Sequence, residues 1–261
     1  MYNCQSRHVP SSNNTIFLFS TKLFRFVIIM DNFKPVTHVI FDLDGLLLDT
    51  ESIYFKLDFQ VCAKYGKEFT HAIKEKLLGT TEFRSAEIII EELDLPVTVQ
   101  EYVDQVKKML LEVVSNVDLM PGAEKLMRHL NENNITFAVA TGASYQMYLL
   151  KIQKNEKLFS LVDHVTAASS DPDVKHGKPA PDVFLVCAER FKDQPHPSKC
   201  LVFEDAPGGV IAAVRAGMQV VMVPDEYISD HLKQEATLVL KSLEDFRPEW
   251  FGLPPYPELK G

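Results

Sequence analysis

The sequence is poor in positive charge. It contains 27 Lys and Arg residues against 36 Asp and Glu residues, which gives a formal net charge of −9. Nucleic-acid polymers and anionic membranes bind basic surfaces, so this balance argues against both as partners. It does not exclude a small anionic substrate, because a bound cation can invert the local field.

Cysteine is also scarce, with residues only at positions 4, 62, 187 and 200. None of them forms a CxxC pair, and their spacing fits no zinc site. We predict reduced, mostly buried thiols, and no cysteine lies beside a plausible base that would make it catalytic. A chain of 261 residues can bury a full core without disulfides or a structural metal.

The first thirty residues lack Asp and Glu, and Arg7, Lys22 and Arg25 are their only fixed charges. We predict that residues 1–29 are either a disordered extension, with Met30 opening the folded protein, or a targeting segment of transit-peptide composition. Lys22 and Arg25 interrupt the apolar run, which argues against a secretory signal and a transmembrane helix. We expect a cytoplasmic protein, or a mitochondrial one if residues 1–29 act as a transit peptide.

Short apolar, β-branched runs alternate with helical periodicity over most of the chain. The predicted strands are 36–41, 135–140, 200–203 and 219–223. Between them, apolar spacing predicts helices at 123–130 and 181–191, and a third around 210–214 that ends before Gly217. This alternation predicts an α/β fold with a doubly wound, parallel, Rossmann-like sheet.

The sequence pattern of residues 52–118 is different, with helical periodicity and no convincing strand. Thr98-x-x-Glu101 is the signature of a helix N-terminal capping box. We therefore predict an α-helical cap domain at 52–118, inserted into a core made of residues 30–51 and 119–261.

Polar residues end three of the predicted strands. Asp42 and Asp44 follow the first, Thr141 follows the second, and Glu204 and Asp205 follow the third. In open α/β sheets, ligands bind outside the carboxyl ends of the strands. Carboxylates that converge there would repel one another unless a cation intervenes, and oxygen ligands beside a phosphate substrate favour Mg²⁺.

The spacing of Asp42-Leu43-Asp44-Gly45 suits covalent phosphoryl transfer. One carboxylate, Asp42, can attack phosphorus, while Asp44 protonates the leaving oxygen and later activates water. Gly45 lets backbone N–H groups approach the phosphoryl oxygens closely.

Three further residues are candidates for binding the phosphate. Lys178 supplies a fixed positive charge that balances the nucleophile and the phosphate. Thr141 offers a hydroxyl donor just before a helix start, with Gly142 beside it.

Taken together, these motifs resemble the haloacid dehalogenase superfamily. Phe41-Asp42-Leu43-Asp44-Gly45 is similar to its first motif, Thr141 to its second, Lys178 to its third, and Glu204-Asp205 to its fourth. The resemblance runs from about residue 36 to residue 255, and the predicted helical insert resembles the family's cap.

The resemblance implies a phosphatase that binds Mg²⁺ through Asp42, the backbone carbonyl of Asp44, Asp205 and Glu204, the last either directly or through its neighbours. It implies Asp42, Asp44 and Lys178 as catalytic residues, and Gly45, Thr141, Gly142 and Lys178 as substrate-binding residues.

Within the superfamily, the stretches 176–184, 200–207, 216–224 and 251–254 are most similar to a phosphatase of a nucleoside 5′-phosphate. We therefore expect a monomer that acts on a small phosphorylated metabolite. A sugar-phosphate phosphatase, a phosphomutase and a catalytically silent binding protein remain as alternatives.

Overall fold

The computed structural model describes residues 33–77, 80 and 82–257. The predicted extension at residues 1–29, and Met30 after it, lie outside this range. No helix in the described part of the chain is long and apolar enough to cross a membrane.

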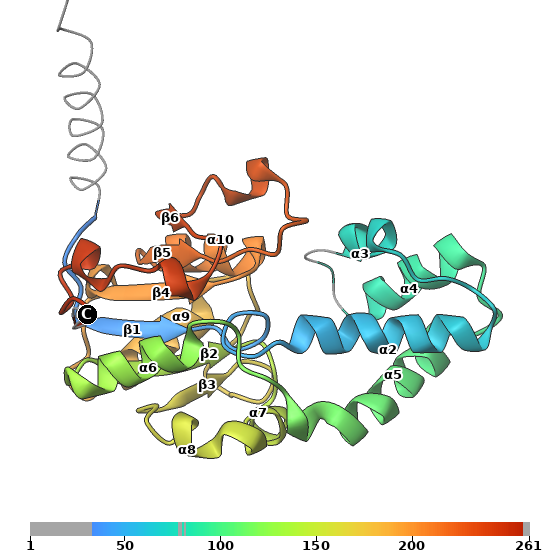
Figure 1. The fold of residues 1–261 in the computed structure, drawn as a ribbon, viewed down its shortest axis with the longest axis horizontal. Coiled ribbons are helices and arrows are strands. Elements are labelled where there is room, and N and C mark those ends of the chain that lie inside the picture. The colour runs from blue at the N-terminus through green and yellow to red at the C-terminus, as the bar shows by residue number, and fades with distance from the viewer. Residues whose placement is uncertain (1–32, 78–79, 81, 258–261) are drawn as a thin grey trace, which may run out of the picture.

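A six-stranded, fully parallel sheet forms the centre of the protein (Figure 1). Its strands are β1 (His38–Phe41), β2 (Thr136–Thr141), β3 (Val165–Ala167), β4 (Cys200–Glu204), β5 (Gln219–Met222) and β6 (Leu238–Val239). Their order across the sheet is β3-β2-β1-β4-β5-β6, so the chain builds outward from β1 on one side and then on the other. The strand order therefore reverses between β1 and β4, where such sheets bind ligands. This topology confirms the predicted fold class.

Apolar residues cover both faces of the sheet, because side chains alternate along each buried strand. On one face, Val39 and Phe41 belong to a core that includes Leu126 of α6 (Ala123–Glu132). On the other, Ile40 belongs to a second core that includes Phe184 of α9 (Asp182–Arg190). The remaining core helices are α7 (Tyr145–Lys151), α8 (Glu156–Phe159) and α10 (Pro207–Arg215).

All four predicted strands and the predicted core helices are present, with small shifts at their ends. The strands β3 and β6 were not predicted. Cys62, Cys187 and Cys200 are buried and free, which confirms the expected thiols for the described cysteines.

Four helices stand together beyond the carboxyl ends of the strands (Figure 1). These cap helices are α2 (Thr50–Lys64), α3 (His71–Leu77), α4 (Glu82–Leu93) and α5 (Val99–Val113). The capping box at Thr98 and Glu101 is formed, as predicted. Asp49 accepts a hydrogen bond from the Ser52 N–H at 3.2 Å, which fixes the start of α2 two residues before the predicted limit of the cap.

The two connections between the sheet and the cap helices pair with each other. The Asp49 N–H donates to the Asp118 carbonyl at 2.9 Å, and the Met120 N–H donates to the Leu47 carbonyl at 2.9 Å. Leu48 and Leu119 form an antiparallel bridge between these bonds. The chain thus leaves the sheet and returns to it through two hydrogen-bonded segments that lie side by side.

A second contact joins the cap helices to the core at α3. The His71 ring stacks on Phe55, with centroids 4.6 Å apart, and on Tyr227 of the loop after β5 at 4.8 Å. In the same region, Lys74 Nζ lies 3.0 Å from Asp225 Oδ2. The helix α3 therefore bridges α2 and the core loop.

Candidate active site

Three carboxylates converge between the ends of β1 and β4. Asp42 follows β1, Glu204 ends β4, and Asp205 comes next. One oxygen from each carboxylate lies within 4.8 Å of the other two. The predicted convergence of these acids is therefore present at the point where the strand order reverses.

The ammonium group of Lys178 lies among these acids. It donates a short hydrogen bond to Asp42 Oδ1, a bond of 2.6 Å to Glu204 Oε1, and one of 3.2 Å to the Ala140 carbonyl. Burial alone would lower the pKa of Lys178, but Asp42 and Glu204 raise it above its usual value. The pairing therefore favours the charged form of Lys178 beside the predicted nucleophile.

Glu204 is 1% exposed, and both of its carboxylate oxygens already accept hydrogen bonds. Oε1 accepts from Lys178, while Oε2 accepts from the N–H groups of Asp205 at 3.0 Å and Ala206 at 3.1 Å. Glu204 thus accepts hydrogen bonds on both oxygens, and these bonds hold the Lys178 side chain and the backbone of Asp205 and Ala206 in place.

The electrostatics of the other two acids fit a site for a hard cation. Burial raises the pKa of Asp42 to about 7, with Glu204 and Asp44 adding to the rise and Lys178 opposing it. Burial also raises the pKa of Asp205 well above its ordinary value, and Glu204 and Asp42 add to this. Buried carboxylate oxygens that destabilise one another's charge are the donor set that Mg²⁺ prefers.

Asp44 is held separately from this cluster. Its Oδ1 lies 2.5 Å from Lys151 Nζ on α7, and its Oδ2 accepts a longer bond of 3.4 Å from the Thr141 hydroxyl. Lys151 was not predicted as a site residue, because a lone lysine in a helical pattern usually lies at a solvated surface.

Backbone donors surround the same strand ends. In the part of the chain that the structure describes, the N–H groups of Leu43, Asp44 and Gly142 have no acceptor. Unpaired N–H groups of this kind favour an anion. The N–H of Gly45 instead donates to the Leu48 carbonyl at 2.9 Å, so this donor already has an acceptor.

Gly45 is needed for a different reason. Its φ is +80°, and a Cβ there would lie 2.2 Å from Asp205 Oδ2. Glycine therefore allows the turn after β1 to pass directly beside the acid at the end of β4.

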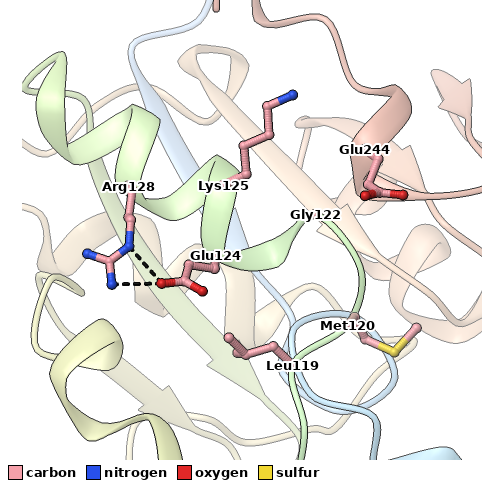
Figure 2. A pocket seen from close by; sticks show the side chains of 7 residues that line it. All are labelled: Leu119, Met120, Gly122, Glu124, Lys125, Arg128 and Glu244. Carbon is pink, nitrogen blue, oxygen red and sulfur yellow. Dashed lines mark hydrogen bonds and ion pairs between the residues drawn. The ribbon is translucent and has the colours of Figure 1, made fainter.

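A large surface hollow lies away from these acids, around the start of α6 (Figure 2). Its volume is about 460 Å³, it is open to solvent, and its lining includes Lys125, Arg128 and Glu244. The Arg128 guanidinium already pairs with Glu124 at 2.7 Å. None of the predicted site residues lines this hollow.

Comparison with known proteins agrees with this geometry. The chain is 48% identical over 223 residues to a probable pseudouridine-5′-phosphatase of Drosophila melanogaster, an alignment that covers 85% of this chain and 96% of that protein. It is 45% identical to (DL)-glycerol-3-phosphatase 2 of Arabidopsis thaliana over 224 residues, or 85% of this chain and 93% of that one.

Among solved structures, a putative β-phosphoglucomutase from Thermotoga maritima superposes with a TM-score of 0.65 at 28% identity. The match covers 80% of this chain and 96% of the Thermotoga chain. Residues 39–223, which include all four motifs, match the haloacid dehalogenase-like hydrolase family. The chain belongs to the haloacid dehalogenase-like hydrolases.

Proposed function

We propose that this protein is a magnesium-dependent phosphatase that hydrolyses a small phosphate monoester through an aspartyl phosphate on Asp42. The observation that carries the proposal is the contact of buried Asp42 with Lys178, beside Asp205 and the unpaired N–H groups at the strand ends. The family and its phosphatase relatives make the chain a phosphoric monoester hydrolase.

In the first half of the reaction, an Asp42 carboxylate oxygen attacks phosphorus and the bond to the leaving oxygen breaks. Asp44 gives its proton to that oxygen, so a neutral alcohol departs. Lys178 and the N–H groups of Leu43 and Gly142 stabilise the negative charge on the transferring phosphoryl oxygens.

In the second half, Asp44 takes a proton from water while the water oxygen attacks phosphorus. The bond between phosphorus and Asp42 breaks, which releases inorganic phosphate and restores the Asp42 carboxylate. The proton bound by Asp44 then serves the next substrate.

The residues suited to hold Mg²⁺ are Asp42 and Asp205, with Glu204 and the Asp44 carbonyl as further candidates. When bound, the ion supplies positive charge that neutralises the phosphate and orients it. Glu204 fits best as the group that fixes Lys178 and the Asp205 backbone, because both of its oxygens are engaged.

We further propose that the substrate is pseudouridine 5′-phosphate. The Drosophila relative supports this.

The contacts of Lys74 argue against a second phosphate on the substrate. A phosphomutase has to accommodate a bisphosphate, whereas Lys74 of α3, which reaches the core loop, is already paired with Asp225 and lies 3.7 Å from Glu51. A sugar-phosphate phosphatase is the second candidate, supported by the glycerol-3-phosphatase relative. The monomeric state and the cytoplasmic location stay predictions.

A substrate panel tests the assignment. We expect pseudouridine 5′-phosphate to exceed uridine 5′-phosphate, glycerol 3-phosphate and hexose phosphates in kcat/KM by about 100-fold or more, because unpaired polar groups in the site reject analogues. The measurement is phosphate release without added bisphosphate. Equal turnover of uridine 5′-phosphate would remove the pseudouridine assignment, and dependence on a bisphosphate would point to a mutase.

A glycine pair in α10 tests the role of Glu204. In Gly209→Ala, the added Cβ would lie 1.8 Å from Glu204 Oε1 and displace a buried carboxylate that holds Lys178. We expect kcat/KM to fall by about 100-fold, as small misplacements of a catalytic group do. Gly208→Ala is the matched control, since its Cβ would meet nothing within 4 Å. Equal activity in the two variants would show that the position of Glu204 is not critical.

A further inference from the structure

Asp44 has a lysine of its own. The ammonium group of Lys151 lies 2.5 Å from Asp44 Oδ1, and the two side chains are 3% and 27% exposed. Lys151 is the last residue of α7, and the four motifs do not include it. In the described part of the chain, Asp44 is the only group that its ammonium contacts.

Such burial sets Lys151 apart from a surface lysine. An ammonium group leaves water at a large penalty unless a partner of opposite charge compensates it. Lys151 and Asp44 therefore fix each other. The Lys151 ammonium is stable at this buried position because Asp44 compensates its charge, and the Asp44 carboxylate gains a partner that is held away from solvent.

The pairing also determines on which side of the site Asp44 lies. Thr141 approaches the Asp44 carboxylate from β2, and Lys151 approaches it from α7. Lys178, by contrast, holds Asp42 and Glu204. The two aspartates of the first motif are thus drawn to different lysines, which keeps the proton-carrying acid apart from the cluster that would bind the metal.

We propose that Lys151 is a positioning residue that holds the Asp44 carboxylate where it exchanges protons with the leaving oxygen and with water. The proposal rests on the phosphatase reaction proposed above. In the described part of the chain the Lys151 ammonium contacts only Asp44, so we expect its effect to pass through Asp44.

The test compares substrates that differ in their need for an acid. An alkyl phosphate needs its leaving oxygen protonated, whereas p-nitrophenyl phosphate does not. For Lys151→Met, we expect kcat/KM with glycerol 3-phosphate or a nucleoside 5′-phosphate to fall by about 100-fold. With p-nitrophenyl phosphate, kcat/KM should stay within about threefold, because that parameter reports steps up to the departure of the leaving group.

The same aryl substrate reports the second half of the reaction. Activation of water also needs Asp44, so kcat and KM should fall together and phosphorylated enzyme should accumulate, visible by mass spectrometry of quenched samples. In an Asp44→Asn background, Lys151→Met should remove little more, since the two residues act as one unit.

Lys154→Met is the matched control. Lys154 also pairs with an aspartate at 2.5 Å, three residues further along, but its side chain is 38% exposed and its partner Asp118 is 77% exposed. We expect this variant to keep both activities. If Lys151→Met fails to fold, Lys151→Gln, which can still donate to Asp44, is measured instead and should show a smaller loss with the same substrate pattern.

Equal losses with alkyl and aryl phosphates, or full additivity with Asp44→Asn, would overturn the positioning role and leave the phosphatase intact. Absence of phosphatase activity in the unmodified protein would instead reject the proposed function itself. The two failures are therefore distinguishable in one set of measurements.

Discussion

Replacing Asp42 with Asn is expected to reduce turnover by about 10⁴-fold or more, because the substitution removes the nucleophile of a covalent mechanism. The amide has nearly the same shape and can still accept a hydrogen bond from Lys178. It lacks the charge that attacks phosphorus, and no other carboxylate occupies the same place after β1. The measurement is phosphate release under saturating substrate, together with a search for phosphorylated protein.

The variant should remain folded, because Lys178 keeps its bond of 2.6 Å to Glu204 when Asp42 is neutral. Asp49→Asn is a useful control on the same connection between β1 and α2, since Asn caps a helix as well as Asp and the Asp49 side chain caps α2. If purified Asp42→Asn loses no more activity than the control Asp49→Asn, and further purification does not remove that activity, the nucleophile is another group.

Removal of divalent cations is expected to abolish turnover, and added Mg²⁺ should restore it. With Asp44 protonated for the incoming substrate, the three other carboxylates at the strand ends face two ammonium groups, so the site is net negative before an anionic substrate arrives. A divalent cation offsets this charge and that of the substrate. The measurement is turnover after exhaustive chelation and during titration with Mg²⁺.

Two further measurements link this requirement to the proposed ligands. Mg²⁺ should raise the melting temperature of the unmodified protein, because a ligand that binds only the folded state stabilises it. Asp205→Asn should need a higher Mg²⁺ concentration for the same turnover. Full activity in the chelated protein would contradict the assignment of the acids as a metal site.

The central strands were predictable because each is an apolar run that ends in a polar residue at the site. Burial on both faces of the sheet makes β1 and β4 continuous in hydrophobicity. The strands β3 and β6 are short, at three and two residues. They lie at the edges of the sheet, where pairing with a neighbour rather than residue pattern defines the strand, so the sequence carried little signal for them.

The residues of the site that belong to sequence motifs could be predicted, and those outside the motifs could not. The convergence of Asp42, Glu204 and Asp205 follows from their positions after parallel strands. Lys151 could not be identified this way, because its role depends on how deeply α7 packs against the sheet. The stack of His71 on Tyr227 is equally hidden, since 156 positions separate two residues whose types suit many surfaces.

The paired segments at 47–49 and 118–120 have a mechanical consequence. Hydrogen bonds between two neighbouring segments hold their relative register, so the two segments have to move together. We expect a cap carried on such a pair to rotate less freely about the connection than it would on a single segment. Each swing would then return the same face of α2 to the acids, so the group that reads the substrate arrives in the same orientation at every turnover.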